Sequence, residues 1–62
     1  MTASDFAGWQ LEMGWTIQQA AYHLGKSIET IRRYRLEGVP GREATVIWLA
    51  CEALRAGLRR AA

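Results

Sequence analysis

The side chains that most often perform enzyme chemistry are scarce in this chain of 62 residues. It has one cysteine, Cys51, and one histidine, His23. Neither residue has a partner at a spacing typical of a nucleophile–base pair or a zinc site, and a single cysteine cannot form a disulfide within the chain. Cys51 is therefore predicted to be a small buried hydrophobic residue and His23 a residue of a helix surface. Trp9 and Trp15 are expected in the core. We expect a protein that is not an enzyme and that holds no metal and no cofactor.

The residues whose type and spacing do suggest chemistry are basic, and they gather in one segment. Residues 26–42 contain five basic side chains and only two glutamates, although the net charge of the whole chain is +2. Such a local excess suits a polyanion, and a solvated helix face is the alternative explanation. The basic residues of this segment are Lys26, Arg32, Arg33, Arg35 and Arg42, and a second group comprises Arg55, Arg59 and Arg60.

The elements that must position these arginines are all predicted to be helices. The sequence has no alternating β-branched run and no hairpin dipeptide. The first helix is expected at about residues 5–13, with Ser4 as its N-cap and Gly14 as the left-handed residue that ends it. After a break at Gly38, Pro40 and Gly41, the last helix is expected at about residues 43–60.

Two short helices are predicted between these. Thr16 and Gln19 have the spacing of a capping box, so the second helix should begin at Ile17 and end at Gly25. Ser27 is the expected cap of a third helix over about residues 28–36. The residues between the two helices leave room only for a tight turn.

The third helix is predicted to cross the second at a small residue, Ala21. Ile31 and Tyr34 should face inward at this crossing, because they are three residues apart and lie on one side of the helix. The residues that point away from Ile31, on the exposed side, are then Glu29, Arg32, Arg33 and Leu36. A helix that presents arginines in this way is typical of a recognition helix for the major groove of DNA.

A run of matching features extends over residues 16–38. They are Thr16, Gln18 or Gln19, Ala21, Leu24-Gly25, Ser27, Ile31, Tyr34 and Glu37-Gly38. In this combination they resemble the helix-turn-helix of the Cro/C1-type (XRE) family of bacterial and phage DNA-binding proteins. The predicted helices on either side fit the same family, so the resemblance covers most of the chain. Three positions depart from the family's usual pattern, namely Ala20, Lys26 and Ile28.

The resemblance implies a sequence-specific regulator of transcription, most simply a repressor or autoregulator, that reads double-stranded DNA through the third helix. Arg32 and Arg33 would read bases, because an arginine side chain can donate two hydrogen bonds to guanine O6 and N7. Glu29 would either accept from cytosine N4 or pair with an arginine of its own helix. Ile28 would either meet a thymine methyl group or pack on the second helix. The residues expected at phosphates are Gln18, Ser27, Thr30, Arg35 and Arg42.

The last helix has more apolar surface than a small core needs. Its apolar residues, from Val46 to Leu58, cover about 200° of a helical wheel, and Trp48 lies outside that arc. A chain of this length has a marginal core and is often stabilised by oligomerisation. We therefore expect a homodimer that binds a palindromic operator. The residues expected at the dimer interface are Val46, Trp48, Leu49 and Ala53.

The fold is thus predicted to be a small all-α bundle of four or five helices, similar to that of lambda repressor. Residues 1–62 should form a single domain, with the helix-turn-helix at 16–38 and a core and dimerisation helix at 43–60. We expect it in the cytoplasm of a bacterial or phage-infected cell, without membrane contact or a small-molecule effector. Two alternatives are an excisionase-like or architectural DNA-binding factor with a wing of two strands after Gly38, and an antitoxin-like or inhibitor-like module that binds a protein.

Overall fold

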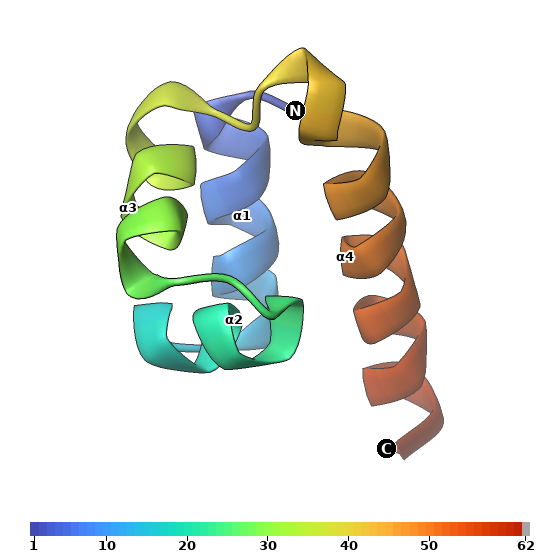
Figure 1. The fold of residues 1–62 in the computed structure, drawn as a ribbon. Coiled ribbons are helices and arrows are strands. Elements are labelled where there is room, and N and C mark those ends of the chain that lie inside the picture. The colour runs from blue at the N-terminus through green and yellow to red at the C-terminus, as the bar shows by residue number, and fades with distance from the viewer. Residues whose placement is uncertain (62) are drawn as a thin grey trace.

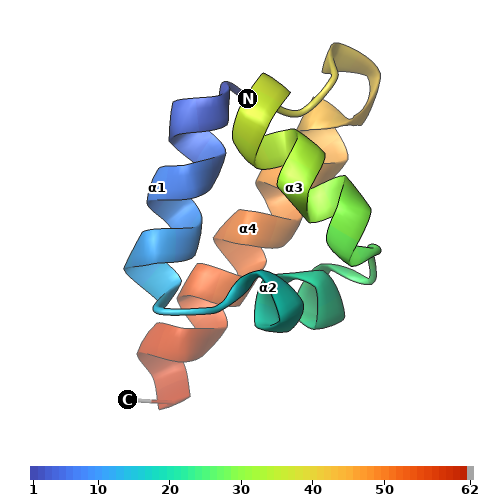
Figure 2. The same ribbon diagram turned by 90° about the vertical axis from the view of Figure 1, so that its left-hand side faces the viewer.

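The computed structural model describes residues 1–61, and the side chains of residues 1–57. This part of the chain forms α1 (Ala3–Met13), α2 (Ile17–Leu24), α3 (Ile28–Glu37) and α4 (Gly41–Ala61). Helices α1, α2 and α3 form one group, and α4 lies beside it, behind α3 in the second view (Figure 1 and Figure 2). The described residues contain four helices and no strand, which confirms the predicted all-α fold class.

The first helix begins earlier than expected, because Thr2 and not Ser4 is its N-cap. The Thr2 hydroxyl accepts a hydrogen bond from the Asp5 backbone N–H at 3.0 Å, and the Asp5 carboxylate accepts one from the Thr2 N–H at 3.1 Å. These two reciprocal bonds satisfy donors that the helix itself leaves free. The bond from the Thr2 N–H also lowers the pKa of Asp5, because it stabilises the charged carboxylate.

The boundaries of the middle helices are close to those predicted. Helix α2 begins at Ile17, and α3 begins at Ile28 and ends one residue later than expected, at Glu37.

Helix α4 begins two residues earlier than expected, at Gly41. The carbonyl of Pro40 accepts a hydrogen bond from the Glu43 N–H at 2.9 Å, so the first turn of α4 forms directly after the proline.

The core is built mainly from aromatic and aliphatic side chains of the inner helix faces. The Phe6 ring lies 5.2 Å from the Tyr34 ring in an edge-on arrangement and 5.5 Å from the Trp9 ring. Cys51 is buried as predicted, and burial raises the pKa of its thiol to about 11, which leaves it protonated at neutral pH. The buried hydrophobic residues are Phe6, Trp9, Met13, Ala20, Ala21, Ile31, Tyr34, Val39, Ile47 and Cys51.

Trp15 was predicted to be a core residue and is only half-buried. It lies in the turn between α1 and α2, where its ring stacks on His23 at 4.0 Å and meets Trp9 edge-on at 5.8 Å. Trp15 therefore covers one end of the core. His23 is exposed, as expected.

Two polar contacts join α4 to the rest of the bundle. The Tyr34 hydroxyl on α3 donates a hydrogen bond of 2.7 Å to the Glu43 carboxylate in the first turn of α4. Burial and this bond raise the pKa of Tyr34 to about 12. Farther along α4, Arg55 forms ion pairs with Glu12 of α1, at 2.8 Å, and with Glu52. Arg55 thus pairs with carboxylates of the protein, and the side chains of Arg59 and Arg60 lie outside the described residues.

The turn from α3 to α4 is held against the N-terminus of the chain. The Val39 N–H donates a hydrogen bond of 2.9 Å to the Met1 carbonyl. Gly38 is buried at this contact, with φ 87° and ψ 178°. A Cβ atom on Gly38 would lie 2.8 Å from the Met1 carbonyl oxygen, so the turn requires glycine here.

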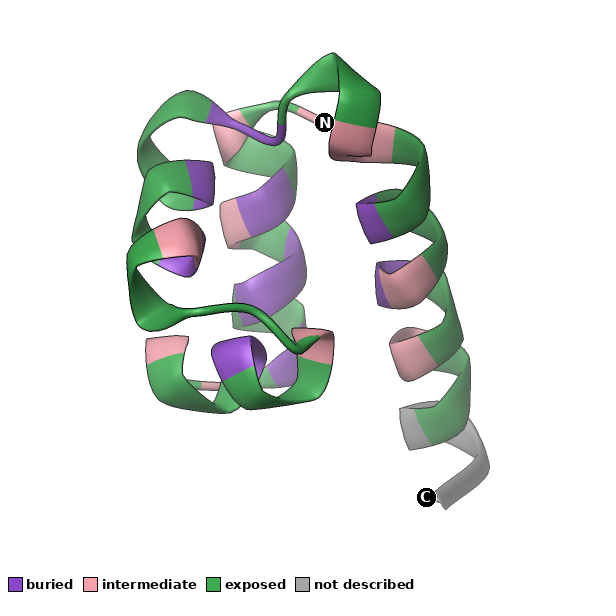
Figure 3. Cartoon of the chain, viewed as in Figure 1, coloured by how far each residue is buried: buried purple, intermediate pink, exposed green. Residues whose placement is uncertain are grey.

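Figure 3 shows how burial is distributed over α4. Its buried positions, Ile47 and Cys51, face the other three helices, and its outer side is exposed. Much of the apolar arc predicted from the wheel is therefore free of contacts with the core. Leu58, which was counted in that arc, has a side chain outside the described residues.

Candidate nucleic-acid interface

The turn between α2 and α3 is built from local hydrogen bonds that the sequence predicts. Thr16 caps α2 through the expected capping box with Gln19, at 2.9 and 3.1 Å. Gly25 ends α2 with φ 67°, in the left-handed region that favours glycine. The Ser27 hydroxyl then accepts the Thr30 N–H at 3.2 Å and caps α3. The two helices are therefore joined by a tight and well-determined turn.

The inner face of α3 is anchored in the core. Ile31 and Tyr34 are almost completely buried, and Ala21 of α2 is 5% exposed. The small side chain of Ala21 lets the two helices pack closely. Because Ile31 and Tyr34 hold the inner face, the residues on the opposite side of α3 must point into solvent.

That outer side holds the residues expected to read bases. Glu29, Arg32 and Arg33 are exposed, and Ile28 has 36% of its surface free. Leu36 lies on the same side near the C-terminal end of α3 and is 81% exposed. Leu36 was seen to point outward in the sequence but was not assigned a contact. An exposed leucine beside arginines adds an apolar surface suited to a thymine methyl group or a deoxyribose.

The charged side chains on this surface make only weak ion pairs with other residues of the protein. The Arg32 guanidinium lies 3.6 Å from the Glu29 carboxylate, and both side chains are mostly exposed. The intrahelical pairing of Glu29, one of its two predicted roles, is thus formed. Exposed pairs of this kind contribute about 0–1 kcal/mol, so DNA could displace it at little cost. Arg33 makes no ion pair with any side chain in the described part of the chain.

The residues expected at phosphates are placed in different ways. Gln18 is exposed in the first turn of α2, close to free backbone N–H groups. Ser27 and Thr30 are at the start of α3, and their hydroxyls share a hydrogen bond of 2.9 Å. Arg42 is on the first turn of α4 with 87% of its side chain exposed, 3.9 Å from Glu43. Helix N-termini at these positions favour phosphate oxygens.

Arg35 has a partner within the protein that the sequence did not reveal. Its Nη1 donates a hydrogen bond of 2.7 Å to the Gln10 side-chain oxygen on α1. Gln10 is 5% exposed and lies 25 positions away in the sequence. No local pattern could have indicated this pair, since capping and helix-face rules connect residues within one or two turns.

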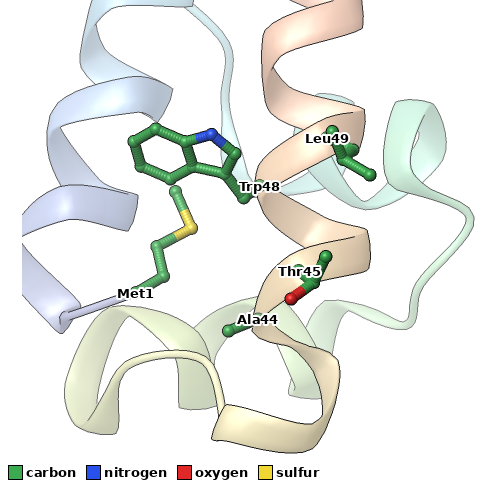
Figure 4. A pocket seen from close by; sticks show the side chains of 5 residues that line it. All are labelled: Met1, Ala44, Thr45, Trp48 and Leu49. Atoms are coloured by element: carbon green, nitrogen blue, oxygen red, sulfur yellow. The ribbon is translucent and has the colours of Figure 1, made fainter.

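The exposed apolar residues of α4 lie on two flanks of the helix. Val46 is 68% exposed, Trp48 51% and Leu49 62%, and Ala53 is exposed as well. Trp48 reaches toward the side chain of Met1, whereas Leu49 points to the other side of α4 (Figure 4). An open apolar hollow of about 280 Å³ lies at this end of α4. It is lined by Met1, Ala44, Thr45, Trp48 and Leu49.

Residues 1–57, whose side chains are described, contain no group of three His, Cys, Asp or Glu side chains that could hold a metal ion. Among the helices that the structure describes, none is long and apolar enough to cross a membrane. Comparisons of this chain with protein-family models, with curated proteins and with solved structures found no match.

Proposed function

We propose that this chain binds double-stranded DNA in a sequence-specific way, with α3 in the major groove, as a small transcriptional regulator of the Cro/C1 (XRE) type. The observation that carries the proposal is the outer side of α3. Arg32 and Arg33 project from a short helix whose inner side is held by Ile31 and Tyr34 and whose N-terminus is capped by Ser27. This geometry resembles that of a recognition helix, which uses its first turns to contact base edges.

The rest of the helix-turn-helix unit supports this proposal. Gln18, Ser27 and Thr30 lie at the N-termini of α2 and α3, where backbone N–H groups and the helix dipole favour a phosphate. Such contacts would fix the register of α3 on the duplex, while Arg33 and its neighbours supply sequence preference. Arg42, on the first turn of α4, would reach a phosphate at the edge of the footprint.

We further propose that two copies associate through α4. One recognition helix covers only a few base pairs, and two such helices about 34 Å apart would reach successive major grooves on one side of DNA. Val46, Leu49 and Ala53 form the flank of α4 that points away from Trp48, and burying them in a symmetric seam would remove exposed apolar surface from water. Trp48, on the other flank beside Met1, would lie outside this seam.

The two alternatives differ in how well they fit. The winged form of an excisionase-like factor needs two strands after Gly38, whereas residues 41–61 are helical, so this alternative fits the chain poorly. A module that binds another protein instead of DNA could use the apolar flanks of α4. The salt dependence of binding to random duplex distinguishes such a module from a DNA-binding protein, because DNA binding through arginines weakens steeply as salt increases.

The experiment that tests the proposal is selection of bound sequences from a random duplex pool. A common motif with two-fold symmetry is the expected result. Arg33→Ala, selected in parallel, should lose the preference at one position of each half-site. If the wild-type protein enriches no sequence over the starting pool, sequence-specific binding is refuted.

A further inference from the structure

Gln10 is the polar side chain that the core of the described structure encloses. Its amide nitrogen donates a hydrogen bond of 3.0 Å to the Trp15 carbonyl, and its amide oxygen accepts the bond of 2.7 Å from Arg35. In addition, the Trp15 N–H donates to the Gln10 backbone carbonyl at 3.3 Å. One residue of α1 therefore holds both the turn that leads into α2 and the C-terminal half of α3.

The chemistry of these partners determines which way the amide points. The Trp15 carbonyl can only accept, and the Arg35 guanidinium can only donate. Gln10 satisfies both because its side chain has a donor at one corner and an acceptor at the other. A hydrophobic residue of the same size would fill the space but would leave the Trp15 carbonyl and Arg35 without this bridge.

The bond to Arg35 is directional, unlike the apolar contacts around it. Ile31 and Tyr34 fix how deeply α3 is buried, but their packing alone permits small rotations about the helix axis. Arg35 is two residues after Arg33, so the two side chains leave α3 on nearly opposite sides. A rotation of about 20° would displace a side chain on the outer surface by about 2 Å. That shift is large compared with the range of hydrogen-bond lengths that base recognition requires.

We propose that Gln10 is a positioning residue that sets the rotation of α3, and thus the sequence preference of the outer side, by holding Arg35 from α1. The inference rests on the proposed DNA-binding function. It also gives Arg35 a role in orienting α3, in addition to the phosphate contact predicted from the sequence. Gln10 itself is buried and uncharged, so it cannot attract DNA directly.

The test compares affinities for the selected duplex and for random duplex, both measured well below the melting temperature. Gln10→Met keeps the volume of the side chain and removes both hydrogen bonds. We expect the ratio of specific to random affinity to fall about tenfold or more, while random-duplex affinity and its salt dependence stay within about twofold. Met13→Ala, three residues along α1, serves as a matched control, because it weakens the core without breaking a polar bond to α3. It should leave the ratio unchanged.

A second variant covers the case in which Gln10→Met does not fold. Arg35→Met removes the donor to the Gln10 oxygen from an exposed position and keeps an unbranched apolar side chain. The ratio should fall in this variant also, although the loss of one positive charge lowers the affinity for both duplexes. If both variants keep the wild-type ratio, the positioning role is refuted.

A measurement without DNA separates this inference from the proposed function. Residual dipolar couplings of backbone N–H groups report the orientation of α3 relative to α1 in the free protein. In Gln10→Met, the couplings of α3 should change and those within α1 should not. Identical α3 couplings in the two proteins would overturn the inference, whether or not the wild-type protein prefers any DNA sequence.

Discussion

Gly38 is the position at which a single added methyl group should disturb this fold most. The change Gly38→Ala places a Cβ atom 2.8 Å from the Met1 carbonyl oxygen and 3.1 Å from the Ala3 backbone nitrogen. Both neighbours are backbone atoms and cannot rotate away as a side chain would. The N-terminal segment or the turn after α3 must therefore move.

The size of the effect follows from two contributions. The backbone of Gly38, at φ 87° and ψ 178°, is in a region that is almost restricted to glycine, and an alanine there costs about 1–3 kcal/mol. Displacing the N-terminal segment also weakens the hydrogen bond from Val39 to Met1, which contributes about 0.5–1.5 kcal/mol. The expected loss in the free energy of unfolding is about 2–4 kcal/mol. For a domain of this size, that corresponds to a decrease in melting temperature of roughly 15–30 °C.

Thermal unfolding followed by circular dichroism measures this loss directly. Gly8→Ala is the matched control, because Gly8 lies within α1 and a Cβ atom there would meet nothing within 4 Å. That change should raise stability by about 0.5–1 kcal/mol, since alanine is the better helix former. If Gly38→Ala melts within a few degrees of the wild-type protein, the contact between the turn and the N-terminus is refuted.

Three further changes test other parts of the account. Arg33→Ala should weaken binding to the selected duplex by about 1–3 kcal/mol and relax one motif position, and equal weakening on random duplex would make Arg33 a phosphate contact instead. Ala21→Leu should lower stability by about 1–3 kcal/mol by overpacking the crossing of α2 and α3, whereas an unchanged melting temperature would contradict the close contact. Leu49→Glu should leave the monomer folded, because Leu49 is 62% exposed, but abolish both dimerisation in analytical ultracentrifugation and operator binding. A wild-type protein that sediments as a monomer at micromolar concentration, with Leu49→Glu binding equally well, would exclude the α4 seam.

Local sequence patterns were sufficient to predict the centre of the fold. Thr16 with Gln19 and the glycine at position 25 determine where α2 begins and ends, because capping bonds join residues only three or four positions apart. The inward direction of Ile31 and Tyr34 followed from helical spacing, and both are buried. The exposed position of Arg33 follows from the same geometry.

The start of α1 was predicted less well for a local reason. Thr2 and Ser4 are both good N-cap residues, and only the structure shows that the carboxylate of Asp5 completes the box with Thr2. Trp15 was expected in the core, but its place in a turn leaves it at the edge, stacked on His23.

The contacts between distant residues could not be predicted from one sequence. Gln10 and Arg35 meet only because α1 and α3 pack side by side, and Gly38 approaches Met1 only because the turn after α3 returns to the N-terminus. Both contacts depend on the relative placement of whole helices, which helical periodicity does not specify. The dimer interface on α4 remains a prediction, although the exposure of Val46 and Leu49 agrees with surplus apolar surface there.

Amide chemical-shift mapping tests most directly whether the outer side of α3 binds DNA. The ¹⁵N-labelled protein is titrated with the selected duplex, and the affinity is followed between about 50 and 200 mM salt. We expect the largest shifts for residues 27–33 and near Gln18, together with an affinity that falls steeply as salt increases. Shifts confined to α4, or an affinity independent of salt, would contradict DNA binding by this side of α3.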